Sequence, residues 1–147
     1  MKITKKQKKK IKKLNKILNK FLKPFGCTAV FGSEFSYILE YKLITYEDHV
    51  DTPDFFTINA EARFPSAKAD PFIWSFIHEL GHHETRNLFS KKHWKEYMKI
   101  IDEGMDDVNY VKLPIEDAAT AWAARFIEYN PKKIKKLWKR VKPFLSF

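Results

Sequence analysis

The spacing of apolar residues predicts a helix at each end of the chain. Between residues 4 and 23, leucine, isoleucine and phenylalanine recur every three or four positions, and lysines fill most of the others. This is the pattern of an amphipathic helix that buries one face against a core. Pro24 and Gly26 mark its end. Residues 131–142 repeat the design, with a second apolar stripe among lysines.

The segment 27–60 has the composition of a short sheet. Its first part is rich in β-branched and aromatic residues and is interrupted by glycine and serine at 32–33, which predicts a hairpin of strands 28–31 and 35–45. A second aromatic and β-branched run predicts a third strand at 54–59. We therefore expect three short strands in an antiparallel-type sheet.

The middle of the chain predicts a helix over 71–86. Asp70 is a suitable N-cap, and Pro71 suits the first helical position. Helical periodicity continues at 90–101 and at 114–129. At 147 residues, with no internal repeat or linker, the chain reads as a single domain, 1–147. The predicted fold class is α+β, with a short sheet surrounded by helices.

The central helix carries an H-E-x-x-H motif. His78 and His82 lie one helical turn apart and about 40° apart around the axis, so both imidazoles can hold one metal ion. Imidazole suits Zn²⁺, and Glu79, at the edge of the same face, can accept a proton from a water on the ion. Gly81 lacks a side chain at a position where a second segment could approach the metal.

A catalytic zinc site needs a third protein ligand, and three residues compete for that role. Glu116 is favoured because it shares a helical face with small residues, which would let its helix lie close to the metal helix. Glu103, which forms an E-x-x-x-D pattern with Asp107, and His93, which precedes a tryptophan, are the alternatives.

Residues 77–83 (IHELGHH) and 114–123 (PIEDAATAWA) together resemble the gluzincin metallopeptidases, in particular lethal factor-like catalytic domains and their bacterial and phage relatives. ImmA/IrrE-type peptidases are similar to a lesser degree, and His93 slightly resembles the downstream histidine of SprT-like DNA-associated proteases. The gluzincin resemblance implies a minimal zincin-like domain in which His78, His82 and Glu116 bind zinc and Glu79 is the general base. It also suggests Tyr110, six residues before Glu116, as the hydrogen-bond donor to the oxyanion. Thr120 stands where the lethal factor-like pattern has a second glutamate, so the residue that would orient a ligand histidine is missing from the motif.

The resemblance implies a peptide or protein substrate, which we expect to lie extended along an edge strand such as 54–59. The alternative is a non-catalytic zinc-binding module, in which a fourth protein ligand such as His83 or Asp107 would close the site. A phage or mobile-element protein would be compatible with the small size and the heavy use of lysine.

The formal net charge of +10 comes mainly from lysines at the two ends of the chain. Arginine, which reads guanine through paired hydrogen bonds, occurs only four times, so sequence-specific DNA recognition is poorly supported. Weak nonspecific binding to nucleic acid or to an anionic surface remains compatible with the charge. A single cysteine, Cys27, excludes an internal disulfide, and no apolar run is long enough to cross a bilayer. These features predict a cytoplasmic protein.

Overall fold

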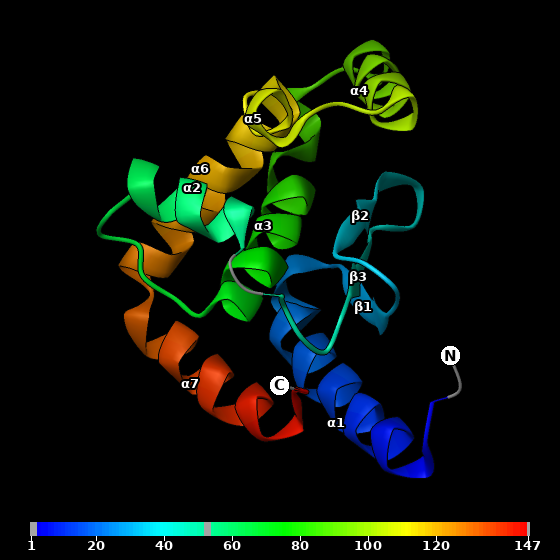
Figure 1. Cartoon of the computed structure of the whole chain (residues 1–147), viewed down its shortest axis with the longest axis vertical. Coiled ribbons are helices and arrows are strands. Elements are labelled where there is room, and N and C mark those ends of the chain that lie inside the picture. The colour runs from blue at the N-terminus through cyan, green and yellow to red at the C-terminus, as the bar shows by residue number, and fades with distance from the viewer. Residues whose placement is uncertain (1–2, 52–53, 147) are drawn as a thin grey trace.

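The computed structural model describes residues 3–51 and 54–146 and confirms the α+β class. One long helix precedes the three strands, and helices alone follow them (Figure 1). The helices are α1 (Lys5–Leu22), α2 (Phe55–Arg63), α3 (Pro71–Thr85), α4 (Lys91–Glu103), α5 (Asp107–Tyr110), α6 (Pro114–Tyr129) and α7 (Pro131–Val141). The strands are β1 (Thr28–Phe31), β2 (Ser36–Ile38) and β3 (Leu43–Tyr46).

Helix α3 lies at the centre of the molecule (Figure 1). It begins as predicted, with Pro71 at its first position and the Asp70 side chain accepting a hydrogen bond from the backbone N–H of Phe72. Almost every later residue of α3 is buried, and the side chains of Ile73, Trp74, Phe76, Ile77 and Leu80 have no exposed surface. A helix that is buried on nearly all sides positions its polar side chains rigidly, because its neighbours fix its rotation.

Both terminal helices dock on this core through the predicted apolar stripes. In α1 the stripe consists of Leu14, Leu18 and Leu22, each with no exposed surface. In α7 the buried residues are Ile134, Leu137 and Val141. Within the described residues, no helix is long and apolar enough to cross a membrane.

The sheet is mixed, so the prediction of an antiparallel hairpin of 28–31 with 35–45 was wrong. The strand order is β1-β3-β2, with β1 parallel to β3 and β2 antiparallel to β3. The reversal falls inside the predicted second strand, where a 3₁₀ turn over 39–41 ends at Lys42 in the left-handed conformation, with φ of 48°. The side-chain amide of Asn19 on α1 bonds both the N–H and the C=O of Ala29, so the outer edge of β1 is covered.

The predicted third strand at 54–59 is also wrong, because this segment belongs to helix α2. Asp54 caps the helix by accepting from the backbone N–H of Thr57 at 3.3 Å. Thr57 and Ala60, three residues apart, are its buried positions, so the segment follows the helical period despite its aromatic and β-branched composition. Its N-cap and period therefore outweighed its strand propensity.

Candidate metal centre

Helices α3 and α6 touch through their backbones beside the H-E-x-x-H motif. A Cβ atom placed on Gly81 would lie 2.4 Å from the backbone oxygen of Ala119, closer than any ordinary contact. Glycine at this position is therefore what lets α6 lie directly against α3. Glu116 and Thr120 stand one turn apart on α6, and Ala119 lies between them in the sequence. The close approach thus carries both side chains to the histidine face of α3.

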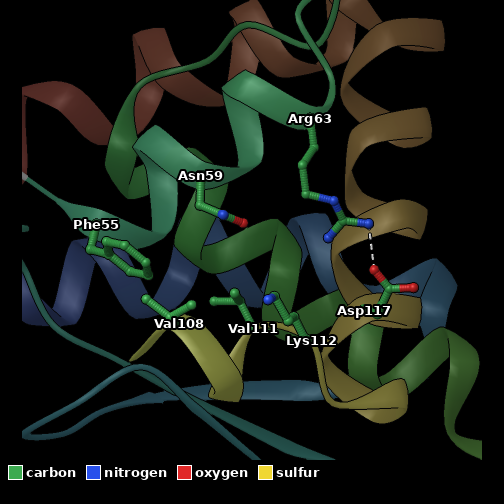
Figure 2. A pocket seen from close by; sticks show the side chains of 7 residues that line it. All are labelled: Phe55, Asn59, Arg63, Val108, Val111, Lys112 and Asp117. Atoms are coloured by element: carbon green, nitrogen blue, oxygen red, sulfur yellow. Dashed lines mark hydrogen bonds and ion pairs between the residues drawn. The ribbon is translucent and has the colours of Figure 1, made fainter. Parts of the chain in front are cut away.

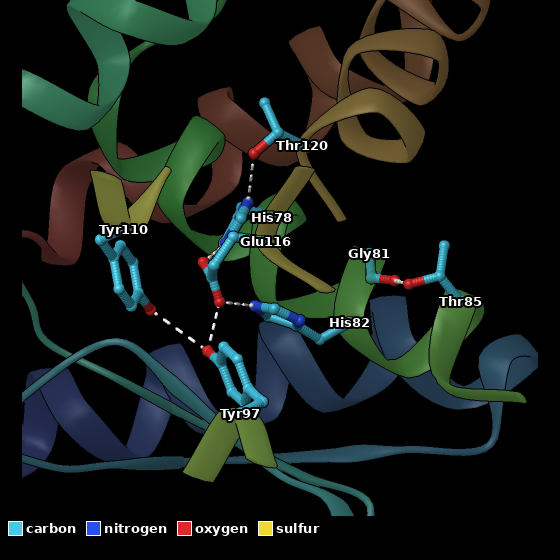
Figure 3. Close-up of polar contacts among 8 residues, drawn as sticks. All are labelled: His78, Gly81, His82, Thr85, Tyr97, Tyr110, Glu116 and Thr120. Atoms are coloured by element: carbon cyan, nitrogen blue, oxygen red, sulfur yellow. Dashed lines mark hydrogen bonds and ion pairs between the residues drawn. The ribbon is translucent and has the colours of Figure 1, made fainter. Parts of the chain in front are cut away.

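The structure brings together His78, His82 and Glu116 (Figure 3). One carboxylate oxygen of Glu116 lies 2.9 Å from His78 Nε2, and the other lies 2.9 Å from His82 Nε2. The exposed fractions of the three residues are 5%, 4% and 2%, respectively. A buried carboxylate from a helix distant in the sequence thus bridges both imidazoles of the motif.

The donor set suits zinc, which prefers imidazole nitrogen and carboxylate oxygen in a tetrahedral arrangement. Ligand atoms at about 2.0–2.1 Å from zinc would lie about 3.3 Å from one another in that geometry. The nitrogen–oxygen distances of 2.9 Å in this site differ from that value by only a few tenths of an ångström. Potential ligand atoms of His78, Glu79 and His82 also lie within 4.8 Å of one another. The residues therefore fit a zinc ion.

Thr120 supports one of the two histidines. Its hydroxyl lies 3.1 Å from Nδ1 of His78 (Figure 3). When Nδ1–H donates to this hydroxyl, Nε2 presents its lone pair to the site, which is the arrangement a metal ligand needs. The residue that departs from the lethal factor-like motif thus contacts a candidate ligand histidine. Nδ1 of His82, in contrast, is buried without a hydrogen-bond partner among the described residues.

The two carboxylates at the site have pKa values that are shifted in opposite directions. For Glu116, burial would raise the pKa, but the charges of His82 and His78 and their hydrogen bonds hold it well below the usual range. For Glu79, burial raises the pKa, and the nearby histidines offset this only in part. Two carboxylates with opposite shifts are typical of sites in which one group holds charge and the other exchanges protons.

Two tyrosine hydroxyls complete the polar cluster around Glu116. Tyr97 on α4 donates a hydrogen bond to Oε2 of Glu116, and the hydroxyl of Tyr110 lies 3.3 Å from that of Tyr97 (Figure 3). Burial and the negative charge of Glu116 raise the pKa of both tyrosines, so both remain protonated donors. Tyr110 was suggested by the resemblance, and its role stays a prediction. Tyr97 was not predicted, because its spacing from Trp94 and Ile101 is that of an ordinary core-facing stripe.

The two alternative third ligands lie elsewhere. His93 belongs to the N-terminal cap of α4, where its Nδ1 lies 2.8 Å from the hydroxyl of Ser90. Glu103 is the exposed last residue of the same helix. Across residues 3–51 and 54–146, no hydrogen bond or ion pair joins either side chain to His78 or His82.

Neither candidate for a fourth protein ligand points into the site. His83 is buried on another face of α3, with Nδ1 2.9 Å from the Tyr37 hydroxyl and Nε2 2.7 Å from the backbone oxygen of Phe25. Both of its ring nitrogens are therefore already engaged. Asp107 is exposed in the first turn of α5.

A groove of about 1140 Å³ lies between β2 and α4. Its walls include Tyr37 and Ile38 from the strand side and Trp94 and Met98 from the helix. The ring of Tyr37 stacks against that of His82 at 6.4 Å, and the ring of Trp94 lies 6.3 Å from it. The groove thus opens beside a candidate ligand.

A second hollow of about 580 Å³ lies between α2, α5 and α6 (Figure 2). Arg63 and Asp117 form an ion pair at its rim, and Phe55 and Val108 supply apolar surface. The next residue of α2, Phe56, packs its ring 4.6 Å from that of His78. Helix α2, which replaces the predicted strand, therefore covers one side of the candidate metal centre.

Comparisons of the chain with protein-family models, with curated proteins and with solved structures gave no match. The chemistry of the site is therefore the basis for inferring a function. Its distinctive features are the bridged histidine pair, a second carboxylate of raised pKa and two buried hydroxyl donors.

Proposed function

We propose that this chain is a zinc-dependent peptidase of the gluzincin type. The observation that carries the proposal is the buried Glu116 carboxylate, which lies 2.9 Å from each imidazole of the H-E-x-x-H motif. Glu116 comes from another helix, 38 residues beyond His78, so helical periodicity within one element cannot account for the arrangement. A buried carboxylate and two imidazoles are costly to assemble unless they hold an ion or perform chemistry.

Each polar residue has a role in this proposal. His78, His82 and Glu116 would hold the ion, and bound zinc would polarise the scissile carbonyl and lower the pKa of the attacking water. Glu79 would act as the general base that accepts the proton of the attacking water and passes it to the leaving amine. The hydroxyls of Tyr97 and Tyr110 donate hydrogen bonds, either to Glu116 or to the oxygen that gains negative charge.

An extended peptide is the proposed substrate, and β2 is the strand that would pair with it. β2 lies at the edge of the sheet and borders the 1140 Å³ groove beside His82. This replaces the segment 54–59, which is helical. Main-chain pairing along β2 would supply part of the affinity, and the groove would accept side chains.

The alternative, a closed zinc site in a non-catalytic module, requires a fourth protein ligand. The engagement of both His83 nitrogens and the exposure of Asp107 favour a site with one open position. An open position is what hydrolysis requires.

A cytoplasmic location is also proposed, and a single unpaired cysteine, Cys27, agrees with it. The Cys27 thiol is buried, and burial raises its pKa to about 11, so the thiol is poorly reactive.

Metal analysis tests the ligand set. Glu116→Ala is expected to lower zinc content sharply, whereas Glu103→Ala and His93→Ala should leave it nearly unchanged. Full zinc retention in Glu116→Ala, or loss in either control, would refute the assignment.

Glu79→Gln tests catalysis separately. This variant should keep its zinc but lose at least about 100-fold in hydrolysis, because the general base is gone. The assay is cleavage of a proteome-derived peptide library, followed by mass spectrometry. Identical cleavage by the wild type and Glu79→Gln, or cleavage by neither, would contradict the peptidase proposal.

A further inference from the structure

The two lysine-rich helices, α1 and α7, form a surface outside the candidate metal centre. Nine of the 18 residues of α1 are lysine, and six of the 11 residues of α7 are lysine or arginine. Neither helix contains aspartate or glutamate. Surface helices that serve only for solubility normally mix both signs of charge, so this one-sided composition points to an anionic partner.

Tertiary structure brings the two helices together. They pack against each other in the lower half of Figure 1, at the opposite end of the molecule from α4 and α5. A groove of about 260 Å³ lies between them. Its cationic rim is formed by Lys20 of α1 and by Lys133, Lys136 and Arg140 of α7. We call the exposed surface of α1 and α7 around this groove the basic face.

We propose that the basic face binds the phosphate backbone of double-stranded nucleic acid without sequence preference. Helix α1 is about 27 Å long at 1.5 Å per residue, so its nine lysines carry about one charge every 3 Å. A DNA strand carries one phosphate about every 3.4 Å. Eight of the nine lysines fall within residues 5–16, so the cationic charge of α1 is concentrated in this part of the helix, where its density is of the same order as that of the phosphates.

The choice of cation explains why no sequence preference is expected. Lysine is a point charge that pairs with phosphate, whereas paired hydrogen bonds to guanine require arginine. In the basic face, α1 has no arginine and α7 has only Arg140. Binding should therefore depend on salt and not on base sequence.

Burial of the apolar stripes argues against a membrane as the partner. A helix that binds a bilayer surface inserts its apolar face among the lipid chains. In α1 that face is Leu14, Leu18 and Leu22, all without exposed surface, and in α7 Leu137 and Val141 are 3% and 0% exposed. Insertion would therefore require unpacking the core. The proposal does not depend on the peptidase function.

The test compares two triple variants of equal net charge. Lys20→Gln, Lys133→Gln and Lys136→Gln together remove three cations from the basic face. The control removes three cations from α4 through Lys91→Gln, Lys95→Gln and Lys99→Gln. All six side chains are exposed, so both variants should fold, and zinc content and thermal stability check this.

Fluorescence anisotropy with a labelled random-sequence duplex of about 20 base pairs measures the affinity at several salt concentrations between about 50 and 200 mM. At the highest salt concentration, the wild type should bind the duplex with a dissociation constant in the micromolar range or weaker. The slope of log affinity against log salt should decrease in magnitude by up to about 2.7 in the basic-face variant, and affinity at low salt should fall more than about tenfold. The α4 control should keep the wild-type slope.

Equal losses in the two variants would show that only the net charge matters and would overturn the proposal. So would equal or tighter binding to phosphatidylserine vesicles or to polyglutamate, which would indicate a membrane or an acidic protein as the partner. A strong preference for one duplex sequence would also contradict it.

Discussion

Gly81→Ala tests whether the contact between α3 and α6 creates the metal centre. The added Cβ would lie 2.4 Å from the oxygen, 3.0 Å from the carbonyl carbon and 3.1 Å from the Cα of Ala119. These are backbone atoms, so no side-chain rotation relieves the overlap. An ordinary contact of about 3.4–3.5 Å requires α6 to move by about 1 Å.

Two opposing terms determine the effect on stability. Alanine in place of glycine within a helix is favourable by about 1 kcal/mol. Overpacking a core costs about 1–3 kcal/mol, occasionally more, and this overlap joins two buried backbones and so belongs at the upper end. We expect a net loss of about 1–2 kcal/mol in the free energy of unfolding. The displacement also moves Glu116 and Thr120 away from His78, so zinc affinity should fall.

Gly32→Ala provides the matched control. The nearest atom to its added Cβ would be Cβ of Thr45 at 3.4 Å, an ordinary contact. Urea denaturation with a chelator present measures stability, and competition with a coloured chelator measures zinc affinity. Gly81→Ala should be impaired in both assays and Gly32→Ala in neither. If Gly81→Ala is as stable as the wild type and binds zinc equally well, close contact between the helices is not what positions Glu116.

Substitutions at four further positions probe individual side chains. Tyr97→Phe removes the hydrogen-bond donor to Glu116 and should weaken zinc binding by about tenfold. Tyr110→Phe should keep its zinc and lower kcat by a factor of about 10²–10³. The reverse pattern would exchange the roles of the two tyrosines. Thr120→Val should weaken zinc binding by about 10–100-fold by removing the partner of the ligand histidine, and Thr120→Ser should restore it; equal binding by all three proteins would count against this contact. His49 has a raised pKa, mainly through its hydrogen bond to Asp48. Protonated His49 should therefore stabilise the fold slightly below the ordinary histidine pKa of about 6.5, and this contribution should be lost as the pH rises through the raised value. Unfolding measured across this rise in pH should show the extra loss in the wild type but not in His49→Gln.

Local elements could be predicted from the sequence wherever periodicity and end signals agree. The apolar stripes of α1 and α7 and the Asp70–Pro71 start of α3 predicted helices, and the structure has them. The spacing within the H-E-x-x-H motif also predicted two imidazoles on one face. The position of Glu116 beside the histidines could also be predicted, because small residues on a helix face indicate close packing. Each of these inferences depends on neighbours within about two helical turns.

The way in which segments far apart in the sequence meet depends on tertiary packing and could not be predicted. Strand pairing is a choice among partners far apart in sequence, so residues 28–46 did not reveal that β1 pairs in parallel with β3. At 54–59, aromatic and β-branched composition conflicted with the cap and the period, and packing of Thr57 and Ala60 resolved the conflict in favour of a helix. Tyr97 has the spacing of an ordinary core residue, and only the docking of α4 places its hydroxyl on Glu116. The close contact at Gly81 likewise decides where the carboxylate lies, because a side chain reaches only as far as the backbone that carries it is allowed to approach.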